Sequence, residues 1–74
     1  MYTQNQIDDL NTADYCEEML YHLTELGVAT EEEISLTTAV AGWNAEVMNG
    51  ILYYKAGLNG LGQLLEENGM LIEE

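Results

Sequence analysis

A threonine followed by three glutamates, at residues 30–33, is the strongest structural signal in the chain. At a helix start, the Thr30 hydroxyl can accept a hydrogen bond from a free backbone N–H, and the Glu33 side chain can reach back to the backbone of Thr30. Three carboxylates in the first turn are also stabilised by the positive end of the helix dipole. Gly27, just before this signal, is typical of the residue that follows a helix end. The chain is therefore predicted to end one helix near residue 26 and to begin another at residue 31.

The segment before this boundary has the apolar spacing of a helix. Apolar residues such as Cys16 and Leu23 fall on one stripe, and the acidic residues lie off it. Asn11 is a suitable N-cap, which predicts a helix over about 12–26. A capping box formed by residues 3 and 6 leaves open an extension of this helix back to Thr3.

Residues 31–56 carry two apolar stripes at helical spacing. One stripe includes Ile34 and Met48, and the other includes Leu36 and Val40. A helical segment that is apolar on two faces is expected to be buried on two faces. This segment is therefore predicted to be the central element of the fold.

The same segment is predicted to be broken near its middle. Gly42 can end a first helix and Asn44 can cap a second, which places the two helices near 31–41 and 44–56. The dipeptide Asn49-Gly50 offers an alternative, because Asn-Gly between apolar runs is typical of a hairpin turn. The helical stripes continue through this dipeptide, which favours the helix over the hairpin.

A short helix over 60–68 completes the predicted elements, with Asn68-Gly69 as its stop signal. The chain has a single cysteine, Cys16, which excludes an internal disulfide, and a single histidine, His22, which excludes a zinc knuckle. Its stability must therefore come from packed helices, a second copy or a partner. The sequence thus predicts an all-α fold in a single domain spanning 1–74. It is expected to be a small bundle of three to four short helices, at about 12–26, 31–41, 44–56 and 60–68.

The charge balance is the most unusual feature of the composition. Fourteen aspartates and glutamates face a single basic residue, Lys55, for a formal net charge of −13. Helix capping explains the glutamates at 31–33, but it does not explain the near absence of lysine and arginine, since ordinary surfaces intersperse both signs. Such a chain repels nucleic acid and anionic membranes, so a partner bound through electrostatics is expected to be a basic protein surface.

Catalytic, metal and cofactor chemistry is not expected. Cys16 and His22 stand about 240° apart around a helix, so they cannot form a nucleophile–base pair locally. Glu18, His22 and Glu25 share one helix face, but no second cluster of ligands accompanies them, and we interpret this face as solvated. Cys16 lies on the apolar stripe, where a free cysteine packs as a small hydrophobe. The protein is therefore predicted not to be an enzyme, with no metal and no cofactor.

The sequence also favours a cytoplasmic location. The first residues carry no basic region followed by an apolar stretch, so no signal peptide is expected. The longest uncharged run, residues 34–45, is too short to span a bilayer. One unpaired cysteine suits a reducing compartment.

In size, acidity and helical composition the chain resembles acyl carrier proteins. Members of that family carry a modified serine at the start of their second helix, within an Asp-Ser-Leu motif. Ser35-Leu36 lies at a similar distance along this chain, with Ile34 in place of the aspartate. The resemblance implies a carrier that is modified on Ser35, which stands as a remote alternative.

The size, charge and helical build also resemble small acidic proteins of bacteriophages and mobile elements, including DNA mimics and anti-CRISPR inhibitors. The resemblance implies a phage-encoded inhibitor that blocks a basic nucleic-acid-binding surface of a host defence nuclease. The alternative is a helical adaptor that forms a homodimer through residues 70–72 and a face around Trp43. The predicted partner-binding residues are Asp8, Asp9, Asp14, Glu17, Glu18, Glu25, Glu31, Glu32, Glu33, Tyr15, Tyr21 and Tyr53.

Overall fold

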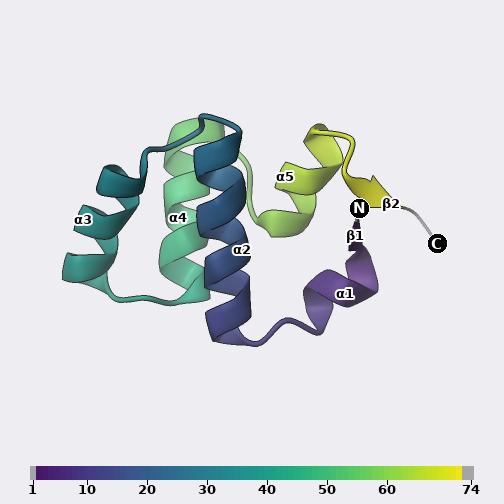
Figure 1. Ribbon diagram of the computed structural model, residues 1–74, viewed down its shortest axis with the longest axis horizontal. Coiled ribbons are helices and arrows are strands. Elements are labelled where there is room, and N and C mark those ends of the chain that lie inside the picture. Colours follow the sequence, from purple (N-terminus) through teal and green to yellow (C-terminus); the bar gives the residue numbers. More distant parts are fainter. Residues whose placement is uncertain (1, 73–74) are drawn as a thin grey trace.

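Helices dominate the structure, a computed structural model that describes residues 2–72 (Figure 1). Four helices lie where the sequence predicts them, and a five-residue helix and one pair of two-residue strands accompany them. The prediction of a small all-α bundle is confirmed. In chain order the elements are β1 (Tyr2–Thr3), α1 (Gln4–Asp8), α2 (Thr12–Glu25), α3 (Glu31–Ala41), α4 (Ala45–Ala56), α5 (Leu61–Glu67) and β2 (Leu71–Ile72).

The turn from α2 to α3 is formed by the local signals that the sequence carries. Gly27 adopts the left-handed conformation (φ 70°), and Val28 N–H donates to the Leu23 carbonyl at 2.9 Å, which closes the end of α2. At the start of α3, Glu33 N–H donates to Thr30 Oγ1, and Thr30 N–H donates to Glu33 Oε1, both at 3.1 Å. The predicted capping box is therefore confirmed.

The extension of α2 back to Thr3, which the sequence leaves open, does not form. The Thr3–Gln6 capping box does form, but it begins the separate short helix α1. Asn11 then takes the extended backbone of an N-cap, and its side chain accepts a hydrogen bond from Asp14 N–H at 2.8 Å. An N-cap residue has non-helical dihedrals, so one continuous helix cannot pass through Asn11.

The predicted break between α3 and α4 is confirmed. Gly42 has a backbone (φ 104°, ψ 161°) that residues with a Cβ rarely adopt, and Asn44 caps α4 by accepting from Val47 N–H at 3.0 Å. Asn49 and Gly50 lie in the middle of α4, so the hairpin alternative is wrong.

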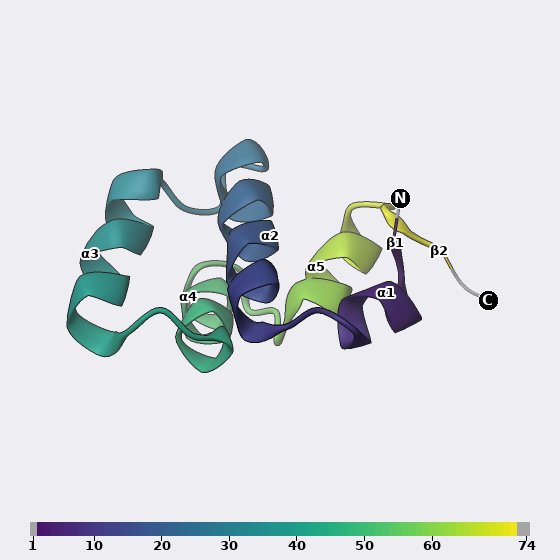
Figure 2. The same ribbon diagram turned by 60° about the horizontal axis from the view of Figure 1, so that its bottom comes forward.

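The core lies where α2 packs against α4, and α2 also contacts α3 and α5. The molecule is elongated, 37 × 23 × 17 Å, with α3 at one end and α1, α5 and the strands at the other (Figure 2). None of the helices among residues 2–72 is long and apolar enough to cross a membrane. The buried apolar residues are Ile7, Cys16, Met19, Leu23, Ala29, Ile34, Met48, Ile51, Leu52, Leu61, Leu64 and Leu65.

The expectation that the segment 31–56 is buried on two faces is wrong. In α3 only Ile34 is buried, while Leu36 is 64% exposed and Val40 is 91% exposed. The break at Gly42 separates the two helices, and α3 then lies at the edge of the molecule, where it contacts α2 and α4 on one side only (Figure 1). The stripe that would have been covered in a central helix therefore faces outward.

The two ends of the described chain are paired. β1 and β2 form a parallel pair, with Tyr2 opposite Leu71 and Thr3 opposite Ile72. Tyr2 N–H donates to the Met70 carbonyl at 2.9 Å. In the C-terminal apolar triplet, Met70 and Leu71 pack against the core, whereas Ile72 is 44% exposed.

One tyrosine connects three helices. The hydroxyl of Tyr15, on α2, donates to Asn49 Oδ1 of α4 at 2.5 Å and accepts from Leu61 N–H at 3.0 Å. Leu61 is the first residue of α5, whose N-cap position is Gly60 and has no side chain to offer. Tyr15 thus accepts, from another helix, a hydrogen bond from one of the free backbone N–H groups at the start of α5.

Candidate protein-binding surfaces

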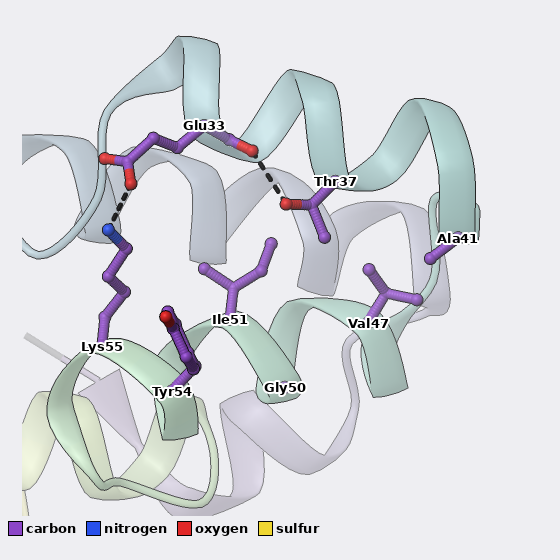
Figure 3. A pocket seen from close by; sticks show the side chains of 8 residues that line it. All are labelled: Glu33, Thr37, Ala41, Val47, Gly50, Ile51, Tyr54 and Lys55. Atoms are coloured by element: carbon purple, nitrogen blue, oxygen red, sulfur yellow. Dashed lines mark hydrogen bonds and ion pairs between the residues drawn. The ribbon is translucent and has the colours of Figure 1, made fainter.

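A groove lies between α3 and α4 (Figure 3). Its volume is about 500 Å³, and every residue that lines it belongs to one of these two helices. The Glu33–Lys55 ion pair lies at one end, and the rest of the lining is mostly apolar. The lining residues are Glu33, Thr37, Ala41, Val47, Gly50, Ile51, Tyr54 and Lys55.

Large apolar side chains protrude beside this groove. Val40 is 91% exposed and Tyr54 is 85% exposed. Val40 follows Thr37 by three residues and Glu33 by seven, so it shares their face of α3. An apolar groove with exposed apolar side chains on the same helices is a candidate interaction site. The sequence carried the signal as the second apolar stripe, which we interpreted as buried.

The glutamates at the start of α3 have different surroundings. Glu31 and Glu32 are exposed, whereas Glu33 is half-buried and bonded both to the backbone of Thr30 and to Lys55. The hydrogen bond from Lys55, followed by that from the Thr30 backbone, lowers the pKa of Glu33 below its ordinary value. Glu33 is thus engaged within the chain, and the other two carboxylates face solvent.

An acidic line runs along the outer face of α2. Asp14, Glu17, Tyr21 and Glu25 are spaced by three, four and four residues, which places them on one face, and all four are exposed. At 1.5 Å per residue the line is about 16 Å long. We call these four residues the α2 ridge. It brings together four of the predicted partner-binding residues.

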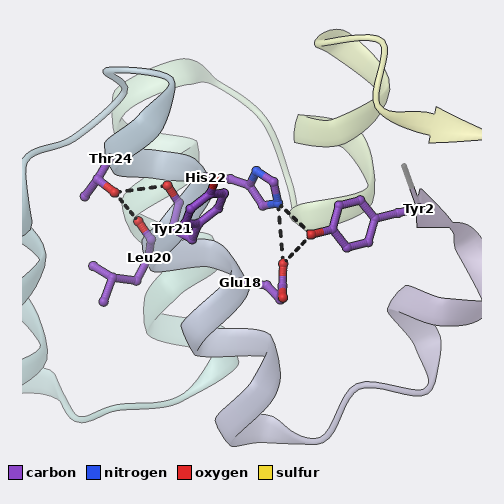
Figure 4. A network of polar contacts seen from close by, with 6 residues as sticks. All are labelled: Tyr2, Glu18, Leu20, Tyr21, His22 and Thr24. Atoms are coloured by element: carbon purple, nitrogen blue, oxygen red, sulfur yellow. Dashed lines mark hydrogen bonds and ion pairs between the residues drawn. The ribbon is translucent and has the colours of Figure 1, made fainter.

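Beside the ridge lies a partly buried polar cluster made by Tyr2, Glu18 and His22 (Figure 4). The Tyr2 hydroxyl donates to Glu18 Oε2 at 2.7 Å, and His22 Nε2 lies 3.3 Å from that hydroxyl and 3.4 Å from Glu18 Oε2. His22 is only 4% exposed. Our interpretation of its helix face as solvated is therefore wrong for His22, because the side chain of Tyr2 reaches from β1 and its ring lies edge-on against the imidazole, with centroids 5.5 Å apart.

This cluster affects two of the predicted partner-binding residues, Glu18 and Tyr21, in different ways. The hydrogen bond to Glu18, together with burial, raises the pKa of Tyr2 above its ordinary value, because ionised Tyr2 would face a carboxylate. Glu18 is thereby held as a partner of Tyr2 and His22. Tyr21, in contrast, is 58% exposed, and its ring rests edge-on against His22 with centroids 5.1 Å apart. The aromatic side chain on the ridge is therefore supported from below.

The remaining predicted residues are dispersed. Asp8 and Asp9 are exposed at the end of α1, where Asp8 Oδ1 accepts from Gln4 Nε2 at 3.0 Å. Tyr53 is 64% exposed on α4. Tyr15 is half-buried, and its hydroxyl is used within the chain.

Two further residues from the sequence analysis can be placed. Cys16 is fully buried, which confirms that it packs as a core residue, and burial raises the pKa of its thiol above the ordinary value. Ser35 is exposed in the second turn of α3. Among residues 2–72, no three His, Cys, Asp or Glu side chains converge in a way that could hold a metal ion.

No protein-family model, no curated protein and no solved structure matches the chain.

Proposed function

We propose that this protein is a non-enzymatic binding protein that occupies a basic, nucleic-acid-binding surface on another protein. In its concrete form it is a phage-encoded inhibitor of a host defence nuclease that acts by DNA mimicry. The observation that carries the proposal is the α2 ridge, where Asp14, Glu17 and Glu25 flank the exposed ring of Tyr21.

The ridge offers a basic partner carboxylates in place of phosphates. Asp14 and Glu17 are three residues apart, which places them about 5–6 Å apart at Cβ, and Glu25 lies eight residues, or about 12 Å, beyond Glu17. A groove lined with arginine and lysine can therefore meet carboxylates at two levels along the helix. Carboxylates also form the same bidentate, charge-assisted pairs with arginine that phosphates form.

The ridge also has the composition of a protein-binding surface. Tyrosine is enriched at the energetic centres of interfaces, and Tyr21 is already oriented by its contact with His22. Because the imidazole is buried and the tyrosine rests on it, little conformational freedom is lost when a partner covers the ring. The net charge of −13 adds long-range attraction toward a basic surface.

The test uses two variants with equal changes in charge. The ridge variant carries Glu17→Lys and Glu25→Lys, and the control carries Glu66→Lys and Glu67→Lys, all at exposed positions. Each protein serves as bait in affinity purification from the native host, and the recovered proteins are identified by mass spectrometry. Binding to the purified partner is then measured by calorimetry from low to high salt.

We expect the wild type and the control to retain a basic nucleic-acid enzyme that the ridge variant loses, with an increase in Kd of at least roughly tenfold. Binding should weaken as salt rises, and DNA should compete for the same surface. Affinity that does not change with salt, or equal effects of the two double variants, would refute the proposal.

A further inference from the structure

We propose that the groove between α3 and α4 is a self-association surface, in which a second copy of this chain docks by a two-fold axis with the two α4 helices antiparallel. This proposal does not depend on the function proposed above, since the α2 ridge lies outside the groove and none of its residues line it.

The first argument is that α3 lacks sufficient burial of its own. It has eleven residues, of which one, Ile34, is buried. Helices in proteins are stabilised mainly by the packing of an apolar face, and an isolated helix of this length is marginal in water. The outward apolar stripe, with Leu36 at 64% and Val40 at 91% exposure, remains uncovered in a single chain. Oligomerisation is a usual source of the missing burial in small domains.

The second argument is that one face contains both a hollow and the protrusions to fill it. The groove has a volume of about 500 Å³, and Val40 and Tyr54 project beside it. A two-fold interface brings the same patch of both subunits together, so it requires a surface that is complementary to itself. A protrusion next to a hollow on one patch meets this requirement.

The third argument concerns Gly50, in the middle of α4. A Cβ at this position would meet no atom within 4 Å, and its backbone has no positive φ, so the fold of one chain does not require glycine there. A glycine inside a helix costs about 1 kcal/mol relative to alanine. A close approach of another backbone is a physical reason for glycine at such a position.

The spacing of residues along α4 is consistent with a two-fold axis that passes through the bond between Gly50 and Ile51. Val47 and Tyr54, which both line the groove, lie equally far from this bond in opposite directions. In an antiparallel pair centred there, Val47 faces Tyr54 of the partner subunit, and Gly50 faces Ile51 of the partner subunit. Gly50 thus leaves room for the branched side chain of Ile51, and Val47 leaves room for the larger ring of Tyr54.

Charge selects this face over the others. Two chains of net charge −13 repel each other, so they can meet only where unpaired carboxylates are few. The groove contains the single lysine of the chain, and that lysine pairs with Glu33. Glu46 and Lys55 are also equally far from the Gly50–Ile51 bond, which brings Glu46 of one copy level with Lys55 of the partner subunit. The α2 ridges stay outside the interface.

Sedimentation equilibrium over a concentration series tests the proposal with three single variants. Val40→Glu places a charge in the interface, and Ala39→Glu is the matched control, an exposed neighbour on the same helix with the same change in charge. We expect a wild-type dimer, a dissociation constant raised at least roughly tenfold by Val40→Glu, and a change below roughly twofold for Ala39→Glu. Gly50→Ala should raise the melting temperature of the dilute monomer and still weaken the dimer.

Higher salt should strengthen the dimer, because screening reduces the repulsion between the two acidic chains. This is opposite to the salt dependence expected for a basic partner, so the two proposals can fail separately. A wild type that stays monomeric at millimolar concentration would overturn the dimer, and so would equal effects of the two glutamate variants. A monomer whose groove instead binds a basic amphipathic helical peptide would overturn it too and would assign the groove to another protein.

Discussion

Replacing Tyr15 with phenylalanine removes one oxygen atom that connects three helices. The ring keeps its shape, so the perturbation is confined to the two hydrogen bonds that the hydroxyl makes, with Asn49 Oδ1 at 2.5 Å and with Leu61 N–H at 3.0 Å. The backbone amide of Leu61 then lacks this partner at the start of α5, and Gly60 offers no side chain in its place.

The expected loss of stability follows from these two hydrogen bonds. Each hydrogen bond contributes a net stability of about 1 kcal/mol, and a donor or acceptor left partly buried without its partner raises the loss. We therefore expect Tyr15→Phe to lower the free energy of unfolding by about 2 kcal/mol. A domain of this size has a total stability of roughly 4–11 kcal/mol, and each kcal/mol corresponds to about 4–8 °C in Tm. The variant should thus melt roughly 8–16 °C below the wild type.

Urea unfolding followed by far-ultraviolet circular dichroism, at a fixed protein concentration, measures the effect. Tyr53→Phe is the matched control, because it removes the same atom from a side chain that is 64% exposed. The control should change the free energy of unfolding by less than about 0.5 kcal/mol. If Tyr15→Phe falls within the same range as the control, the inference that Tyr15 caps α5 is wrong.

Three further outcomes are expected. Thr30→Ala should lower the free energy of unfolding by about 1 kcal/mol, since it removes the capping box of α3, and an unchanged urea midpoint would contradict this. The pKa of the Glu33 carboxyl is lower in the folded state, so ionised Glu33 stabilises the fold at pH values above its unfolded pKa. This stabilisation is lost as pH falls through the folded pKa. Wild type and Glu33→Gln should therefore differ in free energy of unfolding at neutral pH and converge in acid. Added sodium chloride should raise Tm because it screens the repulsion among fourteen carboxylates, and a Tm independent of salt would argue against strong self-repulsion.

The helix boundaries were predictable because their signals are local. The starts of α3 and α4 depend on Thr30 and Asn44, whose side chains bond to amides three residues away. The end of α2 depends on Gly27, which takes the left-handed conformation that the turn requires. Each signal acts within one helical turn, so a single sequence contains all the information needed to read it.

The surroundings of His22 were not predictable in the same way. Its burial depends on Tyr2, which is held in place by β2 at the other end of the described chain. Two-residue strands leave no alternating pattern in the sequence, and their pairing arises only after the helices have packed. The prediction of a solvated helix face failed for this reason.

The candidate surfaces were predictable in part. Helical spacing correctly placed Asp14, Glu17 and Glu25 off the apolar stripe of α2. It also identified the second stripe of α3, but spacing reports which residues share a face and not whether another element covers that face. Val40, at 91% exposure, shows the difference, because no helix among residues 2–72 packs over it.

The pairing of β1 with β2 has a consequence for the order in which the chain acquires its structure. The helix contacts are mostly local and can form early, whereas Tyr2 must find Leu71 from nearly the opposite end of the chain. Closing so long a loop costs conformational entropy, although this cost grows only logarithmically with loop length. A pair of two-residue strands contributes too little free energy to offset this cost until the packed helices have brought the ends together. We therefore expect Tyr2 to cover His22 only after the helices have packed and β2 is in place to hold β1.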